Sequence, residues 1–341
     1  MKNKIGRVTA AYTTDFIEPE LLPLKAGEAR VEIKASLICG SDLHIYKDRH
    51  PAVKLPVTIG HEFSGIVTET AADVNNVKAG DRVVVEPNIT CGFCDACKHG
   101  NYGYCENINF YYRRGDGALA KFFTGRADRM YILPESISFE KAALTEPLAV
   151  AVHSVKRAGI SLGDNVLVIG AGAVGIMTAA VCRKLGAKNV VISDYSECRL
   201  DMIKELADVR TVLASKESIP DIINELSGGK GFDKSFECVG LEATLNQAIS
   251  SVRSNGLVTV VGIFEEPMVK IDASLFAKKE LRIQGSQGYC WDFEDSIQLL
   301  KEIPFEKMIT HRFPLEKLNE ALACAGDISQ NSIKVCVHPG D

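Results

Sequence analysis

The chain has little that would suit it to a nucleic acid, a membrane or the secretory pathway. Its 341 residues carry a net charge of −5, so no basic surface is available to nucleic-acid phosphates or anionic lipids. The N-terminal segment MKNKIGRVTA lacks the apolar core of a signal peptide, and we expect a cytoplasmic protein. No internal repeat, low-complexity tract or coiled-coil heptad pattern is present. A hydrophobic content of 46% and a charged content of 24% fit a globular protein of about two domains.

One uncharged run, residues 166–182, approaches the length of a membrane span, which needs about 20 residues. Its first half contains Gly170, Gly172 and Gly175, and the helical pattern that follows ends in Arg183 and Lys184. Glycines at this spacing and a charged end favour a strand, a turn and a helix over a membrane helix.

The segment VLVIGAGAVG predicts a dinucleotide-binding turn. Val166–Ile169 forms a short apolar strand, and a helical pattern runs from Val174 to Leu185, before Gly186. Between them lies G-x-G-x-x-G, made by Gly170, Gly172 and Gly175. The first glycine allows the tight turn, the second lets a pyrophosphate approach the backbone, and the third lets helix and strand pack closely.

Asp194 predicts which dinucleotide this turn binds. It follows a second apolar strand, Val190–Ile192, and stands 19 residues after Gly175, a spacing that suits a carboxylate bonded to a ribose diol. The same carboxylate repels a 2′-phosphate, so the sequence favours NAD, with an NADP enzyme as the rival hypothesis.

The rhythm of the chain predicts two domains. Residues 1–152 contain mainly β-structure, including Ala29–Ile33, Gly65–Thr68 and Asp81–Val85. From 153 to 285 strands alternate with helices, which is typical of a doubly wound parallel sheet. Residues 286–341 return to mixed structure and are expected to complete the first domain, with the ligand in a cleft between the two domains. The predicted strands of the second domain are Val166–Ile169, Val190–Ile192, Thr211–Leu213, Lys234–Cys238, Leu257–Val261 and Leu281–Gln284, and the last part contributes helices at Phe293–Glu302 and Leu315–Cys324 and a strand at Ile333–Val337.

Four of the eleven cysteines have metal-ligand spacing. Cys91, Cys94, Cys97 and Cys105 form C-x₂-C-x₂-C-x₇-C in a loop rich in Gly, Asn and Asp. Four thiolates complete a tetrahedral zinc shell and leave no position for water, so the pattern predicts a structural zinc. An iron–sulfur cluster, a disulfide pair and free buried thiols are the alternatives.

A second, looser set consists of Cys39, His61 and Glu62. A catalytic zinc takes three protein ligands of this kind and keeps a position for water or substrate. Glu146, in an otherwise apolar stretch, is a further candidate ligand. Ser41 and His44 have the chemistry to pass a proton away from such a site, although Ser41 and Asp42 also fit a simple turn.

Eight motifs lie along the chain: C-G-S-D-L-H (39–44), G-H-E-F-S-G (60–65), G-D-R-V (80–83), the cysteine loop, E-P-L-A-V-A-V-H (146–153), G-A-G-A-V-G (170–175), S-F-E-C-V-G (235–240) and T-H-R-F-P-L-E-K (310–317). Together they resemble the zinc-dependent medium-chain alcohol dehydrogenases, in particular their sorbitol (polyol) dehydrogenase branch. The resemblance implies a GroES-like, mostly β catalytic domain and a Rossmann domain, two zinc ions per subunit, NAD, and a homotetramer or dimer. It also implies that Cys39, His61 and Glu62 hold the catalytic zinc, that Glu146 binds it directly or through water, and that Ser41 and His44 relay the proton.

The resemblance extends the cofactor site beyond the glycine turn. Residues of the first βαβ unit and of two later segments beside the nicotinamide are implied as NAD contacts, and Tyr289 is also placed beside the substrate. The implied residues are Ala173, Val174, Arg199, Val239, Val261, Gly262, Ile263, Gln287, Gly288 and Tyr289.

Two departures from the sorbitol dehydrogenase pattern leave the substrate open. Gly288 stands where that pattern has a sugar-binding arginine, and Ile45 stands where it often has tyrosine. The expected reaction is oxidation of a secondary alcohol of a polyol, with a polyol phosphate, a smaller diol (2,3-butanediol type) or an amino alcohol (threonine 3-dehydrogenase type) as alternatives. A non-catalytic NAD-binding sensor or structural relative is the rival of another class. Arg113 and Arg114 fit either a substrate phosphate or a solvated loop.

Overall fold

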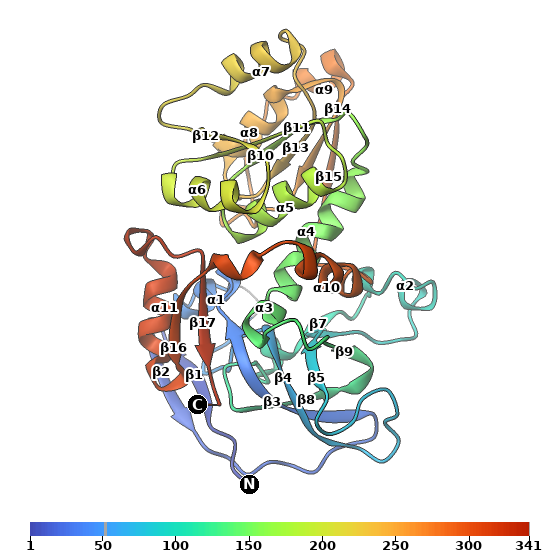
Figure 1. Cartoon of the computed structure of the whole chain (residues 1–341), viewed down its shortest axis with the longest axis vertical. Helices are drawn as coiled ribbons and strands as arrows, with labels where there is room; N and C mark the ends of the chain where they lie inside the picture. Colours follow the sequence, from blue (N-terminus) through green and yellow to red (C-terminus); the bar gives the residue numbers. More distant parts are fainter. Residues whose placement is uncertain (51–52, 341) are drawn as a thin grey trace. The chain divides into compact units, whose positions relative to one another are not determined.

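The structure, a computed structural model, describes residues 1–50 and 53–340, which divide into two compact units (Figure 1). Unit 1 comprises Met1–Glu146 and the chain from Phe293 onward, and unit 2 comprises Pro147–Asp292. The divisions after Glu146 and Asp292 differ from those expected, after residues 152 and 285.

Unit 1 is built around the long strand β3, which is hydrogen-bonded to three other strands. One neighbour, β17, belongs to the C-terminal part of the chain, and its Cys336 pairs with Leu37 of β3. This pairing brings the last residues of the chain beside the segment that follows β3. The seven strands of this mainly antiparallel sheet lie in the order β16 (Ile309–Pro314), β17 (Lys334–His338), β3 (Glu28–Leu37), β4 (Glu62–Thr70), β5 (Arg82–Val85) and β9 (Met130–Ile132), with β8 (Phe122–Arg126) also paired to β3.

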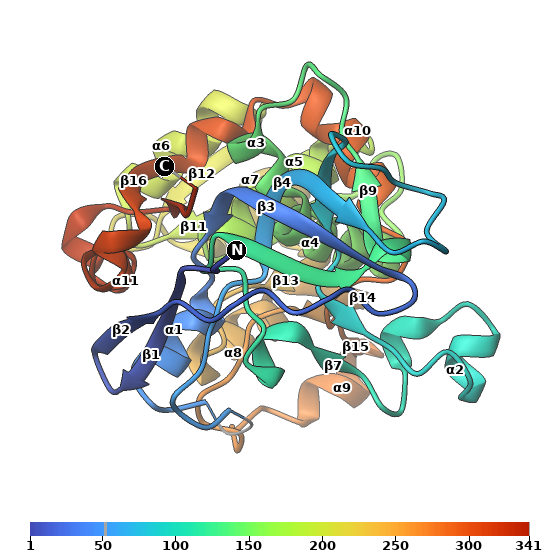
Figure 2. The same ribbon diagram turned by 90° about the horizontal axis from the view of Figure 1, so that it is seen from below.

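Short elements surround this sheet (Figure 2). A hairpin joins β1 (Ile5–Ala10) to β2 (Thr13–Ile17), and β6 (Asn88–Ile89) pairs with β7 (Asn109–Phe110). The helices of this part are α1 (Gly40–Tyr46), α2 (Asp95–Lys98), α3 (Phe139–Ala143), α10 (Phe293–Glu302) and α11 (Leu318–Gly326), and α4 (Thr145–Ala158) begins at its end. Short 3₁₀ turns are η1 (Tyr102–Tyr104), η2 (Tyr111–Arg114), η3 (Ala127–Arg129), η4 (Phe305–Met308), η5 (Leu315–Lys317) and η6 (Ile328–Gln330).

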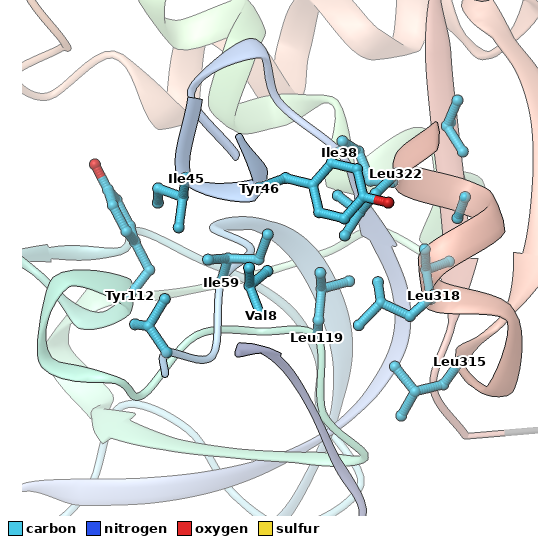
Figure 3. Close-up of a cluster of buried hydrophobic side chains, with 14 of the residues drawn as sticks. Val8, Ile38, Ile45, Tyr46, Ile59, Tyr112, Leu119, Leu315, Leu318 and Leu322 are labelled. Carbon is cyan, nitrogen blue, oxygen red and sulfur yellow. The ribbon is translucent and has the colours of Figure 1, made fainter. Parts of the chain in front are cut away.

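A hydrophobic cluster fixes α1 against the C-terminal helix α11 (Figure 3). Ile45 and Tyr46 of α1 are 1% and 4% exposed and belong to the same cluster as Leu318 and Leu322 of α11. The Tyr46 hydroxyl also donates to Asn319 Oδ1 at 3.1 Å. Burying side chains of this size contributes about 1.5–3 kcal/mol each, so the cluster gives α1 a fixed place at the end of β3.

Unit 2 has a six-stranded parallel sheet, which confirms the predicted Rossmann domain. Its order reverses between β10 and β13, and right-handed crossovers then place the helices of the two halves on opposite faces. The strand order is β12 (Arg210–Leu213), β11 (Asn189–Asp194), β10 (Asn165–Ile169), β13 (Phe232–Glu237), β14 (Val252–Val260) and β15 (Arg282–Gly285), and the helices are α5 (Ala173–Lys184), α6 (Glu197–Leu206), α7 (Ile219–Ser227), α8 (Glu242–Ser251) and α9 (Ser274–Lys279).

The predicted elements are present with shifts at their ends. The uncharged run at 166–182 folds as β10, the glycine turn and most of α5, and none of the described helices is long and apolar enough to cross a membrane. β14 begins five residues before the predicted strand, because the chain bends at Asn255, which has a φ of +57°, and stays paired with β13 on both sides of the bend. The helix expected at Leu315–Cys324 opens with the 3₁₀ turn η5.

Candidate active site and cofactor site

The glycine turn after β10 has the geometry that its sequence predicts. Gly170 has a φ of +99°, and its N–H donates to Ser193 O of β11 at 2.8 Å. A Cβ at Gly175 would lie 1.9 Å from the carbonyl oxygen of Gly170, so only glycine lets the helix approach the strand this closely. Gly172 is the N-cap of α5 and makes no side-chain cap. The first N–H groups of α5 are therefore available to an anion such as a pyrophosphate.

Asp194 ends β11, directly beside this turn. Its Oδ2 accepts a hydrogen bond from the Ala171 N–H at 2.6 Å, and its Oδ1 accepts one from the Ser196 N–H at 2.8 Å. The carboxylate is thus held at the carboxyl end of the sheet, at the edge of the glycine turn. This is the position that suits a ribose diol.

The other half of the same sheet edge is organised by Glu237, which sequence reasoning missed. This buried carboxylate ends β13 and accepts hydrogen bonds from the N–H groups of Val239 and Gly240, at 2.9 and 2.8 Å. A Cβ at Gly262 would lie 2.4 Å from the Gly240 nitrogen, so the loops after β13 and β14 touch through glycine. An acidic residue directly after an apolar strand, followed by C-V-G, was the available signal in the sequence.

The remaining predicted cofactor residues follow the carboxyl ends of the strands. Val239 and Ile263 are 41% and 68% exposed, which leaves apolar side chains open beside the glycine contact. Arg199 lies on α6, and its N–H donates to Ser196 Oγ at 3.4 Å. Ala173 and Val174 lie in the first turn of α5, Val261 follows β14, and Gln287, Gly288 and the buried Tyr289 follow β15.

One cavity of unit 2 lies away from the predicted cofactor residues. It has a volume of about 480 Å³ and is lined by residues such as Ile219, Lys230 and Lys279. None of the predicted cofactor residues lines it. The cofactor site is therefore defined by the strand ends and the glycine turn, not by this cavity.

The cysteine loop brings its four sulfur atoms together as a zinc site requires. Cys91 Sγ lies 3.6 Å from Cys105 Sγ and 4.0 Å from Cys97 Sγ, and all four sulfurs lie within 4.8 Å of one another. Tetrahedral zinc with Zn–S bonds of about 2.3 Å requires sulfur separations of about 3.8 Å. Backbone N–H groups of Phe93 and Cys94 lower the pKa of Cys91 to about 6, which favours the thiolate that binds metal. The residues present fit the ion.

One buried network holds this loop to the sheet. The Tyr102 hydroxyl donates to Glu86 Oε2 at 3.1 Å, and Arg129, paired with the same carboxylate at 3.3 Å, stacks 4.1 Å from the Tyr102 ring. Helix α2 of the loop has no buried residue, and Phe93 is 67% exposed. Since the loop has so little core, a metal ion would supply most of its order.

The second donor set forms where β3 ends and β4 begins. Leu37 of β3 pairs with Glu62 of β4, and the antiparallel pairing brings Cys39, two residues after Leu37, close to His61, which precedes Glu62. One ligand atom each from Cys39, His61 and Glu62 lies within 4.8 Å of the others. His61 and Glu62 are 6% and 0% exposed. A thiolate, an imidazole and a carboxylate with water in the remaining position fit a catalytic zinc.

Asp42 supports this set, although the sequence left it as a turn residue. It is completely buried, accepts hydrogen bonds from the N–H groups of Cys39 at 2.9 Å and Gly60 at 3.2 Å, and lies 3.6 Å from His61 Nδ1. Burial lowers the pKa of His61, but Asp42 and Cys39 outweigh it and raise that pKa well above its ordinary value. With a carboxylate near Nδ1, Nε2 is the candidate ligand nitrogen, although 3.6 Å is longer than a hydrogen bond.

Lys334 is a second residue that sequence reasoning missed. Its Nζ lies 2.5 Å from both carboxylate oxygens of Glu62 and 3.3 Å from the carbonyl oxygen of Ile38. Burial lowers the pKa of Lys334, but Glu62 and Cys39 outweigh it and raise that pKa. The ammonium therefore neutralises the buried carboxylate. Nothing near Lys334 in the sequence marks it, because the partners stand 272 residues apart.

The other predicted catalytic residues lie around the donor set. Glu146 is 6% exposed in the first turn of α4, and its charge contributes to the raised pKa of Lys334. Its oxygens are not among the three donors grouped within 4.8 Å in the described residues. Ser41 and His44 are three residues apart on α1, partly exposed, while Ile45 and Tyr46 face the core. The Tyr112 ring lies 5.1 Å from the His61 ring.

A third group of possible donors, Glu140, Cys336 and His338, is held by an ion pair. Both oxygens of Glu140 accept hydrogen bonds from the Arg312 guanidinium, at 2.8 and 2.7 Å. His338 Nε2 lies 3.0 Å from the same carboxylate. Arg312 lowers the pKa of Glu140, and His338 lowers it further. We interpret this group as an ion-pair cluster that stabilises the packing of α3 against β16 and β17, and not as a metal site.

A glycine turn with a carboxylate beside it and a buried S/N/O donor set are typical of one class of protein, the metal-dependent dehydrogenases that use a nicotinamide dinucleotide. Comparison with known proteins agrees. Residues 25–135 match the alcohol dehydrogenase GroES-like domain, and residues 173–302 match the zinc-binding dehydrogenase family. The chain belongs to the zinc-dependent alcohol dehydrogenases, which confirms the resemblance and the fold class expected from the sequence.

Similar proteins cover nearly the whole chain. Sorbitol dehydrogenase of Bacillus subtilis is 30% identical over 98% of this chain and 97% of its own. L-arabinitol 4-dehydrogenase of Talaromyces emersonii is 36% identical over 92% of this chain and 85% of its own. The crystal structure of galactitol-1-phosphate dehydrogenase from Escherichia coli superposes with a TM-score of 0.91 at 27% identity, covering 98% of this chain and 100% of that one.

Proposed function

We propose that the protein oxidises a secondary alcohol of a polyol to a ketone, with NAD as the hydride acceptor. The observation that carries this proposal is the buried donor set of Cys39, His61 and Glu62, whose imidazole is oriented by a completely buried carboxylate. Similar proteins that act on sorbitol and L-arabinitol support a polyol substrate. The overall reaction converts the alcohol and NAD⁺ into the ketone, NADH and one proton.

The residues of unit 1 divide the work around the metal. When bound, zinc supplies Lewis acidity toward the substrate hydroxyl, and NAD supplies the hydride acceptor. Cys39, His61 and Glu62 hold the ion, Asp42 orients His61, and Lys334 offsets the charge of the carboxylate. Glu146, close to this set, is a further candidate ligand, directly or through water.

Ser41 and His44 are the candidate proton relay. Their spacing of three residues places a hydroxyl and an imidazole on the same side of α1. Both are partly exposed, so a proton released by the substrate hydroxyl can pass from Ser41 to His44 and then to water.

Asp194 supports NAD over NADP. Its carboxylate is held by two backbone N–H groups beside the glycine turn, and a 2′-phosphate at that place would meet like charge. In the same proposal the residues predicted from the resemblance, from Ala173 to Tyr289, line the dinucleotide at the carboxyl ends of the strands. A second zinc ion, in the cysteine loop, is structural because four thiolates leave no open position.

The two departures from the sorbitol pattern act differently. Ile45 is 1% exposed and packs in the core, so it offers nothing to a substrate. Gly288 has a φ of +57°, a conformation that favours glycine and leaves no side chain to bind a sugar hydroxyl. The substrate must therefore be recognised by other groups than in the sorbitol pattern.

We further infer a homo-oligomer, a tetramer or dimer, located in the cytoplasm. β15 is the edge strand of the unit 2 sheet, and its Ile283 is 37% exposed. An open edge with an apolar side chain can pair with a second copy. Light scattering of the wild type and Ile283→Lys tests this: the variant should have a lower mass.

The cluster of four metal-ligand thiols suits a reducing compartment.

Metal analysis combined with an alcohol panel tests the main proposal. The purified protein should hold two zinc ions per subunit and reduce NAD with at least one of a set of hexitols, pentitols, polyol phosphates, butanediols and threonine. Cys39→Ser should lose one zinc ion and the activity but keep NAD binding. Cys198→Ser, at an exposed cysteine, should keep both zinc ions and the activity. One zinc per subunit, unaffected by Cys39→Ser, would contradict the catalytic site, and NAD binding without turnover would favour a sensor.

A further inference from the structure

Arg113 lacks the partners that a partly buried arginine normally has. It lies in η2, and its guanidinium stacks 4.8 Å from the ring of Phe110 and 5.9 Å from that of Tyr112. Its Nε is buried and has no hydrogen-bond partner among the described residues. Arg129, the comparable stacked arginine of the same unit, also has a buried Nε without a partner, but its terminal nitrogen Nη1 is paired with the carboxylate of Glu86. A buried donor without a partner is costly, and such exceptions call for an explanation.

This arginine is one aromatic ring away from the candidate catalytic metal site. Tyr112 is 5% exposed, and its ring lies 5.1 Å from the ring of His61 and 5.9 Å from the Arg113 guanidinium. Phe110 lies 5.5 Å from Tyr112 and continues the same aromatic surface. A ligand group at Arg113 would thus lie within the length of a small molecule from the donor set.

The charge of Arg113 acts on a histidine beside this surface. The ring of His50 packs edge-on at 6.4 Å from Tyr112. Burial lowers the pKa of His50, and Arg113 and His44 lower it further, while the buried Asp42 acts weakly against them. Arg113 and His50 therefore lie close enough to interact at this aromatic surface.

The neighbouring arginine behaves differently. Arg114 is exposed, and its charge counteracts the effect of burial on the pKa of Asp116, two residues further on. The two consecutive arginines thus have different surroundings. Arg114 interacts with a carboxylate, whereas Arg113 stacks on an aromatic surface beside the candidate metal site.

We propose that Arg113 binds an anionic group carried by the polyol substrate, either a phosphate monoester or a carboxylate. This inference rests on the proposed function and names the substrate class. A guanidinium donates in parallel to two oxygens of such an anion, and its stacking on Phe110 fixes the plane in which it does so. The anion supplies a counter-charge at the partly exposed end of the guanidinium, whereas the buried Nε lies out of its reach. It also gives the substrate a fixed point from which a carbon chain extends toward the donor set, in place of the arginine that Gly288 does not provide.

The test compares three substrates that differ only at one end: a hexitol, its phosphate monoester and the corresponding aldonic acid. The wild type should prefer the phosphate, the carboxylate or both, and the two anions distinguish the source of the charge. In Arg113→Gln, kcat/KM for the preferred anion should fall roughly 10- to 100-fold, as expected for hydrogen bonds to a charged group. The neutral hexitol should change less than about twofold, by the same reasoning. Arg113→Lys should recover part of the loss, because it restores charge without the planar fork.

Arg114→Gln is the matched control and should leave kcat/KM unchanged for the hexitol, its phosphate monoester and the aldonic acid. Thermal unfolding and NAD binding should be the same in all variants, which separates a binding role from a structural one. The inference is overturned if Arg113→Gln lowers activity equally on neutral and anionic substrates, or if the wild type prefers the neutral hexitol over both anions.

Binding of the phosphorylated hexitol, measured by calorimetry, keeps this inference separate from the proposed function. If the zinc-loaded wild type oxidises no alcohol at all, the proposed function fails. The anion site then still stands if the phosphorylated hexitol binds the wild type and not Arg113→Gln. It falls if the two proteins bind it equally or not at all.

Discussion

Replacing Lys334 with methionine should destabilise the protein strongly, because it leaves Glu62 without its buried ammonium. Both side chains are almost inaccessible, 5% and 0% exposed, and Nζ lies 2.5 Å from each carboxylate oxygen. Breaking a buried pair by removing one partner costs about 3–5 kcal/mol. For a domain of this size each kcal/mol shifts Tm by about 2–4 °C, so we expect a Tm roughly 6–20 °C lower.

The size of this loss should depend on metal. A zinc ion bound by Glu62 would supply positive charge to the same carboxylate, so Lys334→Met should cost more in chelator-treated protein than in zinc-loaded protein. Differential scanning calorimetry of both forms measures the difference. A raised pKa means that the lysine contributes its full stability below its unfolded value of about 10.4 and loses it only as the pH rises through the higher folded value. The effect should therefore be constant between roughly pH 6 and 9.

A double-mutant cycle gives the control. Glu62→Gln removes the charge that Lys334 neutralises, so Lys334→Met should cost much less in that background. Equal losses in the two backgrounds would show that the lysine stabilises by packing alone and would refute the ion-pair argument.

Three further predictions concern other parts of the molecule. Cys94→Ser should lose one zinc by elemental analysis and expose the cysteine loop to protease, whereas Cys198→Ser should do neither; unchanged zinc in both would remove the structural site. Arg312→Gln should lower Tm by about 2–4 °C at pH 7, roughly 1 kcal/mol for this partly exposed pair. Because Arg312 lowers the pKa of Glu140, the stability that the pair contributes is present above the unfolded pKa of about 4.3 and is lost as the pH falls through the lower folded pKa. The Tm values of the wild type and Arg312→Gln should therefore converge as the pH is lowered from 7 into the acid range. A difference in Tm that persists in acid would argue against the pair. Asp194→Ser should weaken NAD about 10-fold and improve NADP in side-by-side kinetics, as expected from one charged hydrogen bond, and an unchanged ratio would contradict its role.

Features made by neighbouring residues could be predicted from the sequence. The glycine turn is set by steric requirements within a few residues, and the structure has the positive φ at Gly170 and the close approach at Gly175 that those requirements imply. The helix predicted at Phe293–Glu302 has the same bounds in the structure, because its apolar spacing is unambiguous. The spacing of Cys91, Cys94, Cys97 and Cys105 likewise predicted that the four sulfur atoms lie close together, as they do in the structure.

Features made by distant residues could not be predicted in this way. Asp42 looked like a turn residue, and only the folded structure places it 3.6 Å from His61. The adjacent Arg113 and Arg114 are equivalent in the sequence, and only packing separates the one that stacks on Phe110 from the one that faces Asp116. Patterns report local conformation, whereas burial and charge pairing depend on which segments meet.

The sequence by itself predicted the four-cysteine set, the dinucleotide turn and the alternation of strands and helices, because each depends on spacing within a short stretch of chain, whereas Cys39 meets His61 and Glu62 only through the pairing of β3 with β4. The tertiary structure alone decided what surrounds them. Pairing of β17 with β3 brings Lys334 to Glu62 across 272 residues, and no local rule encodes that meeting. The candidate metal ligands belong to short sequence motifs, whereas the fold brings the buried charges of Asp42 and Lys334 beside them.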